Sequence, residues 1–140
     1  MANANDEASY GIVPYLFYSD APAAIDFLCR AFGFAEQFRY PMPDGRLGHA
    51  ELTYKSNVLM LASVYAEGGF SNPLTLPAVH SQLYCTVDDV DAHHERARAA
   101  GATIVTEPAN DHGHRLYRVI DPEGHRWMFV GPITNGGGKP

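Results

Sequence analysis

The sequence predicts an α+β fold built from two βαβββ modules that form curved mixed sheets around a cavity. The order of one strand, one helix and three strands can be read in the first half of the chain and again in the second. Each predicted helix follows an aspartate of the type that caps helices, and each ends at a glycine. The halves also align at a fixed offset of 68 residues, which pairs Asp20 with Asp88, Gly33 with Gly101, Gly45 with Gly113 and Met60 with Met128.

The first module begins with a β-rich aromatic run from Ile12 to Tyr18. Ser19-Asp20, followed by Pro22, predicts the start of a helix, whose apolar positions recur every three or four residues until Gly33. Three strands are expected after the helix, with short turns between them. They are Glu36–Tyr40, Leu47–Tyr54 and Val58–Val64, and the turns are Pro43-Asp44-Gly45 and Lys55-Ser56-Asn57.

The second module repeats this order after a segment rich in Gly, Pro, Ser and Asn. We expect a single domain over residues 1–140, with module one at about 10–65, a loop at 66–79, module two at about 80–131 and a flexible C-terminal tail. The elements of module two are a strand at Gln82–Val87, a helix at Val90–Ala100 after Asp88-Asp89, and strands at Thr103–Val105, His114–Ile120 and Arg126–Val130.

Composition narrows the class of protein. The 140 residues are 46% hydrophobic, which suits one packed core, and the two cysteines exclude a disulfide scaffold. The net charge of -6 and the lack of a basic run argue against nucleic-acid binding. No apolar run is long enough to span a membrane, and the acidic start Met1–Ser9 does not resemble a signal peptide, so a cytoplasmic protein is expected.

Four segments carry a resemblance to a known family. With the duplicated βαβββ order, they resemble the vicinal oxygen chelate superfamily, which includes glyoxalase I, extradiol dioxygenases, fosfomycin-modifying enzymes and bleomycin-resistance proteins. The resemblance covers about residues 12–130. The segments are Pro14-Tyr15-Leu16, Gly48-His49-Ala50-Glu51-Leu52, Val87-Asp88-Asp89-Val90-Asp91 and Asp121-Pro122-Glu123-Gly124-His125-Arg126-Trp127.

In metal-dependent members, the resemblance implies four inward-facing ligands that hold a divalent cation. The third-strand position falls on Glu51, a carboxylate as expected, whereas the first-strand position falls on Val13 or Pro14, which cannot ligate. The equivalent positions of module two fall on Gln82, a weak oxygen donor, and on Met128. Two of the four ligands are therefore missing, although His80 could join Glu51 and Gln82 in a rearranged site.

Two functions from different classes follow from this comparison. The first is a metal-independent protein of the bleomycin-resistance type, which sequesters an aromatic or amphipathic compound, confers antibiotic resistance and needs no cofactor. The alternative is a lyase, isomerase or dioxygenase that uses Zn, Ni, Mn or Fe at a rearranged site. We favour the binding protein because the ligand set is incomplete, and no catalytic residue is assigned.

The expected ligand-binding residues belong to the faces that the family uses for its site. Tyr15 and Phe17 alternate along the first strand and would form an aromatic wall. Arg115 is either a cation at the mouth of the cavity or a surface charge. The full set is Tyr15, Phe17, His49, Glu51, Gln82, Tyr84, Arg115 and Met128.

The remaining histidines and the oligomeric state can also be predicted. The adjacent His93 and His94 diverge on a helix and are read as part of a solvated face, and His112 and His114 are read as part of a polar loop. A homodimer is predicted, because a two-module chain of this size exposes apolar sheet edges and aromatic side chains.

Overall fold

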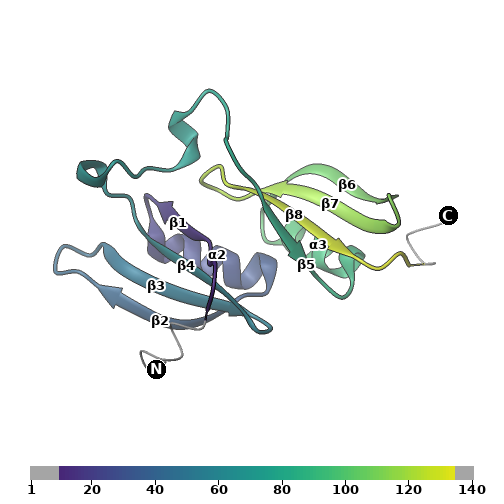
Figure 1. Cartoon of the computed structure of the whole chain (residues 1–140), viewed down its shortest axis with the longest axis horizontal. Helices are drawn as coiled ribbons and strands as arrows, with labels where there is room; N and C mark the ends of the chain where they lie inside the picture. Colours follow the sequence, from purple (N-terminus) through teal and green to yellow (C-terminus); the bar gives the residue numbers. More distant parts are fainter. Residues whose placement is uncertain (1–9, 135–140) are drawn as a thin grey trace. The chain divides into compact units, whose positions relative to one another are not determined.

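The computed structural model describes residues 10–134 and confirms the α+β class (Figure 1). The described residues form two compact units, one of residues 10–29 and 33–72 and the other of residues 30–32 and 73–134. Each unit contains one four-stranded mixed sheet. Two segments for which the sequence makes predictions lie outside the described residues. They are the N-terminal segment Met1–Ser9 and the C-terminal tail from residue 135.

The first unit has the predicted βαβββ order. Its sheet follows the order β1-β4-β3-β2, in which β1 runs parallel to β4 and the other neighbours are antiparallel. The short 3-10 helix η1 (Ala66–Gly68) follows the sheet. The elements are β1 (Tyr15–Tyr18), α2 (Ala21–Phe32), β2 (Ala35–Pro41), β3 (Leu47–Tyr54) and β4 (Asn57–Ser63).

Helix α2 begins and ends where the sequence predicts. The Asp20 carboxylate accepts a hydrogen bond from the Ala23 backbone N–H at 3.1 Å, which satisfies one of the unpaired donors of the first turn. At the other end Gly33 adopts a left-handed conformation, with φ of 86°. The apolar positions Ile25 and Leu28 are buried, as their spacing predicts.

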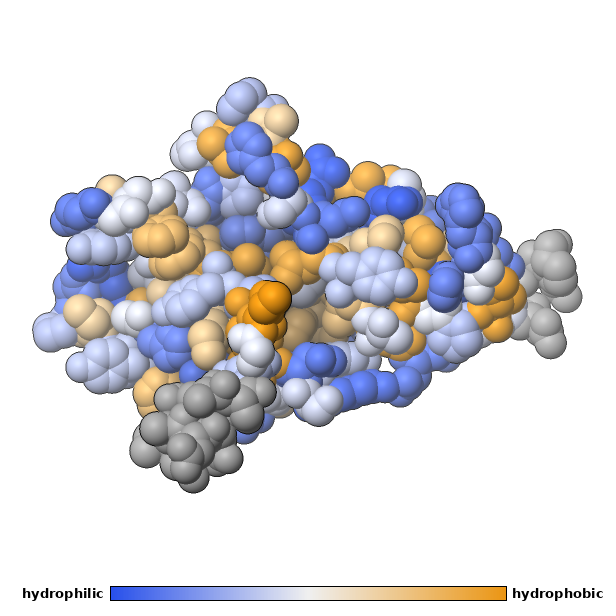
Figure 2. All heavy atoms as spheres, in the orientation of Figure 1, coloured by the Kyte–Doolittle hydropathy of each residue, from blue (hydrophilic) through white to orange (hydrophobic). Residues whose placement is uncertain are grey.

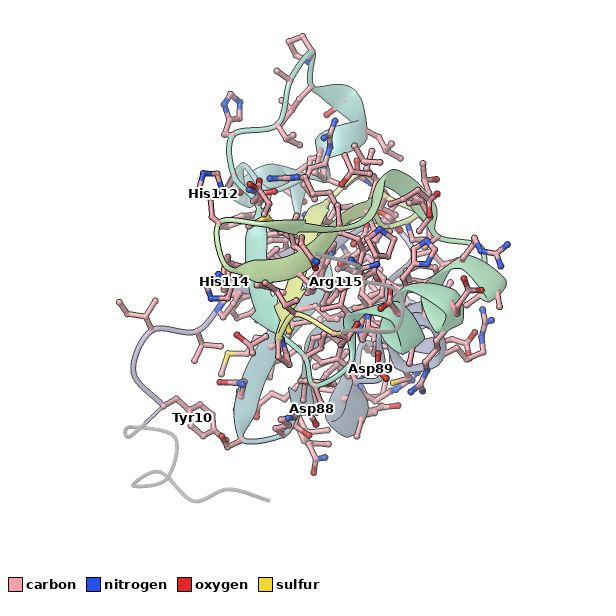
Figure 3. The ribbon with its side chains drawn as sticks, turned by 90° about the vertical axis from the view of Figure 1, so that its right-hand side faces the viewer. Tyr10, Asp88, Asp89, His112, His114 and Arg115 are labelled. Carbon is pink, nitrogen blue, oxygen red and sulfur yellow. The ribbon has the colours of Figure 1, made fainter. Side chains whose placement is uncertain are left out.

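The second unit repeats this architecture, with sheet order β5-β8-β7-β6 and β5 parallel to β8. The hairpin between β6 and β7 turns through His112 and Gly113, which both have positive φ (52° and 83°), as a two-residue hairpin loop requires (Figure 3). The elements are η2 (Pro73–Thr75), β5 (Leu83–Thr86), α3 (Val90–Ala99), β6 (Thr103–Asp111), β7 (His114–Ile120) and β8 (Arg126–Gly131).

Three boundaries differ from the prediction. Strands β1 and β5 begin later than expected, at Tyr15 and Leu83. Strand β6 extends to Asp111, well past the expected end at Val105. It accommodates Pro108 because it is an edge strand, where an absent N–H need not break a ladder, and its pairing with β7 is irregular between Thr106 and Ala109.

The capping residue of α3 is also displaced. Asp89 caps this helix by accepting a hydrogen bond from the Ala92 backbone N–H at 3.1 Å, so the residue equivalent to Asp20 is Asp89 and not Asp88. The fixed offset of 68 is therefore one residue short at this point. The two helices still occupy the same place in the element order, which is what the repeat predicted.

Helix α3 packs against β6, β7 and β8 through an aromatic core. The side chains of Phe32, Trp127 and Phe129 are at most 1% exposed, and the Phe32 ring lies 4.8 Å from that of Phe129 and 5.2 Å from that of Trp127. His93 and His94 face this core and are only 9% and 5% exposed. The expectation that they form a solvated face is wrong, because both side chains turn toward the ring of Tyr117 in the sheet.

No helix among residues 10–134 is long and apolar enough to cross a membrane. Cys29 and Cys85 are half-buried and are not joined in a disulfide.

Candidate functional site

One face of the first sheet brings together side chains from all four of its strands. In register, Tyr15 of β1 pairs with Met60 of β4, Met60 pairs with Glu51 of β3, and Glu51 pairs with Phe38 of β2. Residues that pair in register project to the same face of a sheet, so these four side chains form a row across it. Phe17 follows Tyr15 by two residues and therefore shares this face.

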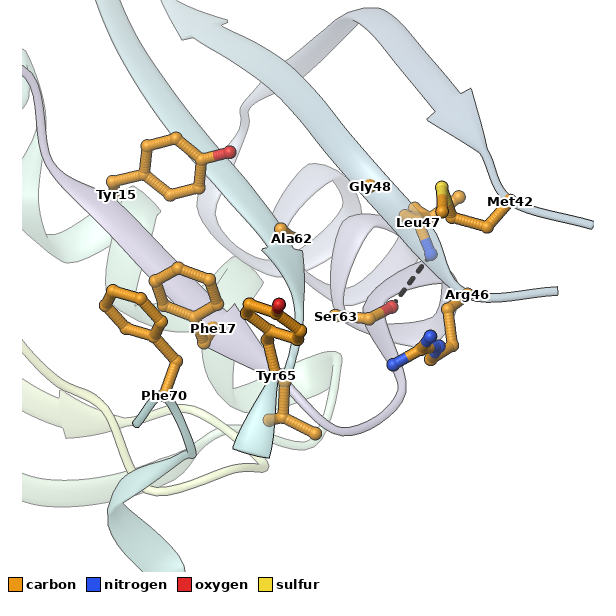
Figure 4. A pocket seen from close by; sticks show the side chains of 11 residues that line it. Tyr15, Phe17, Met42, Arg46, Leu47, Gly48, Ala62, Ser63, Tyr65 and Phe70 are labelled. Carbon is orange, nitrogen blue, oxygen red and sulfur yellow. Dashed lines mark hydrogen bonds between the residues drawn. The ribbon is translucent and has the colours of Figure 1, made fainter. Parts of the chain in front are cut away.

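A pocket of about 430 Å³ opens in this unit, beside β1 and the end of β4 (Figure 4). Aromatic rings form one wall of it. The rings of Tyr15 and Phe17 are stacked with centroids 5.4 Å apart, and those of Phe17 and Phe70 are stacked at 4.2 Å. The expectation of an aromatic wall at Tyr15 and Phe17 therefore has a matching feature in the structure.

Phe70 comes from the segment that the sequence predicts only as a connecting loop. The backbones of Tyr65 and Phe70 form a pair of hydrogen bonds of 3.1 and 3.0 Å, with η1 and the left-handed Gly69 between them. This closed turn holds the Phe70 ring against that of Phe17. It also places Tyr65 at the pocket wall. In the sequence this arrangement leaves only a weak signal, two aromatic residues separated by a four-residue stretch that ends in Gly68-Gly69.

The polar edge of the pocket lies at the hairpin between β2 and β3. Arg46 lines the pocket, and its Nε donates to the Asp44 carboxylate at 2.9 Å. The Ser63 hydroxyl accepts a hydrogen bond of 2.8 Å from the Leu47 backbone N–H, which fixes the end of β4 beside the start of β3 (Figure 4). The sequence does not predict these residues as part of the site, because nothing in the local pattern links them to β1.

A chain of hydrogen bonds runs across the same sheet face from β1 to β3. The Tyr15 hydroxyl lies 2.7 Å from His49 Nδ1, and His49 Nε2 lies 2.9 Å from Glu51 Oε2. Glu51 is only 9% exposed. Burial, and secondly the charge of Glu51, raises the pKa of Tyr15, so its hydroxyl remains protonated at neutral pH.

The structure thus gathers four of the predicted site residues, Tyr15, Phe17, His49 and Glu51, on one sheet face. Tyr15 and Phe17 line the pocket, and His49 and Glu51 extend from Tyr15 through hydrogen bonds.

The predicted site residues of the second unit are arranged differently. Tyr84 pairs in register with Met128, and its side chain is 61% exposed. Gln82 and His80 precede β5 and are exposed.

The structure contradicts one of the two alternatives that the sequence left open for Arg115, the surface charge. It alternates with the buried Tyr117 and Val119 along β7, so its side chain points toward α3 and is only 6% exposed. Its guanidinium donates to the Asp91 carboxylate at 2.9 Å and to the Asn110 side-chain oxygen at 3.1 Å, and the bond to Asp91 lowers the pKa of that carboxyl group. The expectation of a surface charge is wrong, because this cation joins α3 to the β6–β7 hairpin.

The donors on the described residues do not fit a divalent metal site as they stand. Among residues 10–134, no three side chains of His, Cys, Asp or Glu gather closely enough to hold an ion. Both ring nitrogens of His49 and one oxygen of Glu51 already take part in hydrogen bonds with each other and with Tyr15. A catalytic divalent ion usually has three protein ligands, which this arrangement does not supply.

A duplicated βαβββ fold with an aromatic pocket on a sheet face defines a class of small α+β proteins. The chain matches the model of the Glyoxalase/Bleomycin resistance protein/Dioxygenase superfamily over residues 11–129. It therefore belongs to that superfamily, as its sequence motifs indicated.

Comparisons with individual proteins agree with this assignment. An uncharacterized protein of Mycobacterium bovis is 40% identical over 124 residues, which are 86% of this chain and 82% of that protein. The crystal structure of TioX from Micromonospora sp. ML1 is similar with a TM-score of 0.69 and 33% identity, over 87% of this chain and 98% of that one. A glyoxalase I mutant from Zea mays shares the fold, with a TM-score of 0.66 and 18% identity over 84% of this chain and 43% of that one.

Proposed function

We propose that the protein binds a flat aromatic or amphipathic small molecule in the pocket of its first unit and that it does so without a metal. The observation that carries the proposal is the stacked aromatic wall of Tyr15, Phe17 and Phe70 beside a pocket of about 430 Å³. Small-molecule sites usually have volumes of roughly 300–1,000 Å³ and apolar walls with a few polar groups.

The wall suits a planar ligand for a physical reason. A flat ring that slides over Phe17 or Phe70 buries apolar area and gains an offset-stacked contact, which contributes about 0.5–1.5 kcal/mol beyond the area term. Tyr15 and Arg46, which line the pocket, carry a hydroxyl and a guanidinium that can make polar contacts with a ligand. An amphipathic aromatic compound would therefore match both parts of the pocket.

Binding without a metal is supported by the state of the candidate donors. His49 Nε2 and Glu51 Oε2 are bonded to each other at 2.9 Å, so a cation would have to break this hydrogen bond to recruit either atom. Sequestration of such a compound, as in the bleomycin-resistance branch of the superfamily, is the role that we infer from this arrangement.

The experiment uses 2-methoxynaphthalene, a flat fluorescent probe, and measures its affinity by titration. We expect Phe17→Ala and Phe70→Ala each to weaken binding by about tenfold, because each removes a stacked ring from the wall. The matched control is Phe38→Ala, which removes an exposed ring from the same sheet face outside the pocket. Equal losses in all three variants, or no binding by the wild-type protein, would contradict the proposal.

A further inference from the structure

We propose that the hydrogen-bond chain from Tyr15 through His49 to Glu51 presents the Tyr15 oxygen to the pocket as an acceptor, so that the site selects aromatic compounds bearing an O–H or N–H donor. Phenols and aromatic amines are the chemical class. The inference rests on the proposed function, because it concerns the polar contact made by a ligand in the same pocket.

The chain links two strands that are not neighbours in the sheet. Tyr15 lies on β1 and His49 and Glu51 lie on β3, with β4 between them. The two short contacts, 2.7 Å at Nδ1 and 2.9 Å at Nε2, engage both nitrogens of the His49 ring. The ring is therefore held between a hydroxyl and a carboxylate, in the same order of groups as a hydroxyl–imidazole–carboxylate triad.

The direction of each hydrogen bond follows from what the groups can donate. A carboxylate accepts hydrogen bonds and donates none, so His49 Nε2 carries the proton that bonds to Glu51. A neutral imidazole has a single N–H, so Nδ1 is then an acceptor. With the ring in this neutral form, the Tyr15 hydroxyl donates the hydrogen bond at Nδ1.

This direction decides what Tyr15 offers to a ligand. A tyrosine hydroxyl has one proton, and here that proton is committed to His49, which leaves only oxygen lone pairs for the pocket that Tyr15 lines. Because the pKa of Tyr15 is raised, the proton stays on the hydroxyl under ordinary conditions. A ligand donor near Tyr15 is satisfied, whereas an ether or carbonyl oxygen would be left without a partner.

A pair of probes that differ only in whether the oxygen carries a hydrogen or a methyl group tests the inference. The probes are 2-naphthol, which donates through its hydroxyl, and 2-methoxynaphthalene, which cannot donate. We expect the wild-type protein to bind 2-naphthol about three to ten times more tightly, which corresponds to one net hydrogen bond. The preference should disappear in Tyr15→Phe, which keeps the aromatic ring and removes only the oxygen.

Two further variants test whether the preference depends on the hydrogen-bond chain or on any nearby hydroxyl group. Tyr40→Phe removes a hydroxyl from the residue that pairs with His49 on β2 but does not line the pocket, and it should leave the preference unchanged. Glu51→Gln supplies an amide that can donate to His49 Nε2, which allows the opposite tautomer and frees the Tyr15 proton. The preference for 2-naphthol should therefore fall in Glu51→Gln, with thermal melting as the check that each variant is folded.

The outcomes distinguish this inference from the proposed function. If both probes bind the wild-type protein equally, or if the preference persists in Tyr15→Phe, the inference is wrong while the aromatic pocket stands. If neither probe binds, the proposed function and this inference are both wrong. If the preference is lost in Tyr15→Phe and reduced in Glu51→Gln but kept in Tyr40→Phe, the inference is supported.

Discussion

Asp121 shows how one residue organises one of the four segments that carry the family resemblance. One carboxylate oxygen accepts hydrogen bonds from the backbone N–H groups of Glu123 and His125, at 3.0 and 3.1 Å. The other accepts from the Trp127 indole at 3.1 Å. Asp121 is 2% exposed and Trp127 is 1% exposed. The motif is therefore a hydrogen-bonded turn that anchors a core side chain and lies outside the candidate site.

His93 is a second residue whose environment has a measurable consequence. Its Nε2 donates to the Phe32 carbonyl at 2.9 Å, and its Nδ1 lies 2.7 Å from the Tyr117 hydroxyl. Burial in this aromatic core, more than any neighbouring charge, lowers the pKa of His93 to about 4. Charging the ring in the folded state is therefore costly.

We predict that His93 makes the folded protein less stable as the pH falls. The pKa of His93 is about 4 in the folded chain and about 6.5 when unfolded, so between these values the unfolded chain binds the extra proton. The contribution of His93 is fully present above pH 6.5 and falls as the pH approaches 4, by up to about 3 kcal/mol. Urea unfolding of the wild-type protein at pH 7, 6, 5 and 4.5 measures this slope.

The control for this prediction is His93→Phe, which keeps an aromatic ring in the core and removes the titrating group. This variant should have a lower free energy of unfolding at pH 7, because the Phe32 carbonyl and the Tyr117 hydroxyl lose a partner. Its stability should nevertheless change less between pH 6.5 and pH 4.5. An unchanged slope in the variant would show that other groups cause the pH dependence.

At the scale of secondary-structure elements, both helices start at a side-chain cap that the sequence predicted to within one residue. We expect Asp89→Ala to lower the free energy of unfolding by about 1 kcal/mol, because the Ala92 backbone N–H loses its acceptor. Asp89→Asn keeps a side-chain oxygen at the same place and should cost much less. Denaturant unfolding at pH 7 compares the two variants, and equal losses would exclude capping as the cause.

The whole molecule repeats one architecture in two units, each with side chains exposed on its sheet. Tyr40 on β2 and Tyr84 on β5 are 58% and 61% exposed. Figure 2 shows hydrophobic and hydrophilic residues interspersed on the face turned to the viewer. The homodimer expected from such exposed aromatic surface stays a prediction.

For the whole molecule, we predict a low content of bound metal. Protein purified without a chelator should carry well under one equivalent of Zn, Ni, Mn or Fe, because a pair of donors already bonded to each other holds a divalent ion weakly. Elemental analysis of the wild-type protein and of Glu51→Ala measures this. A stoichiometric metal that disappears in Glu51→Ala would instead favour the metal-dependent lyase, isomerase or dioxygenase.

The local sequence was enough to predict the element order and the faces of the strands. Alternation placed Glu51 opposite the packed Leu52, and the caps at Asp20 and Gly33 marked both ends of α2. These features depend on side chains a few residues apart, so their physics is contained in a short stretch of chain. The same reasoning placed Tyr15 and Phe17 on one face of β1.

Only the tertiary structure decided which distant side chains meet. Tyr15 and His49 are 34 residues apart and make contact because β1 and β3 flank β4, and Phe70 reaches Phe17 because a closed turn folds back on the sheet. The burial of His93, and of Arg115 against Asp91, likewise depends on how α3 packs on its sheet. Sheet pairing and helix packing join remote segments, and local periodicity contains no information about those partners.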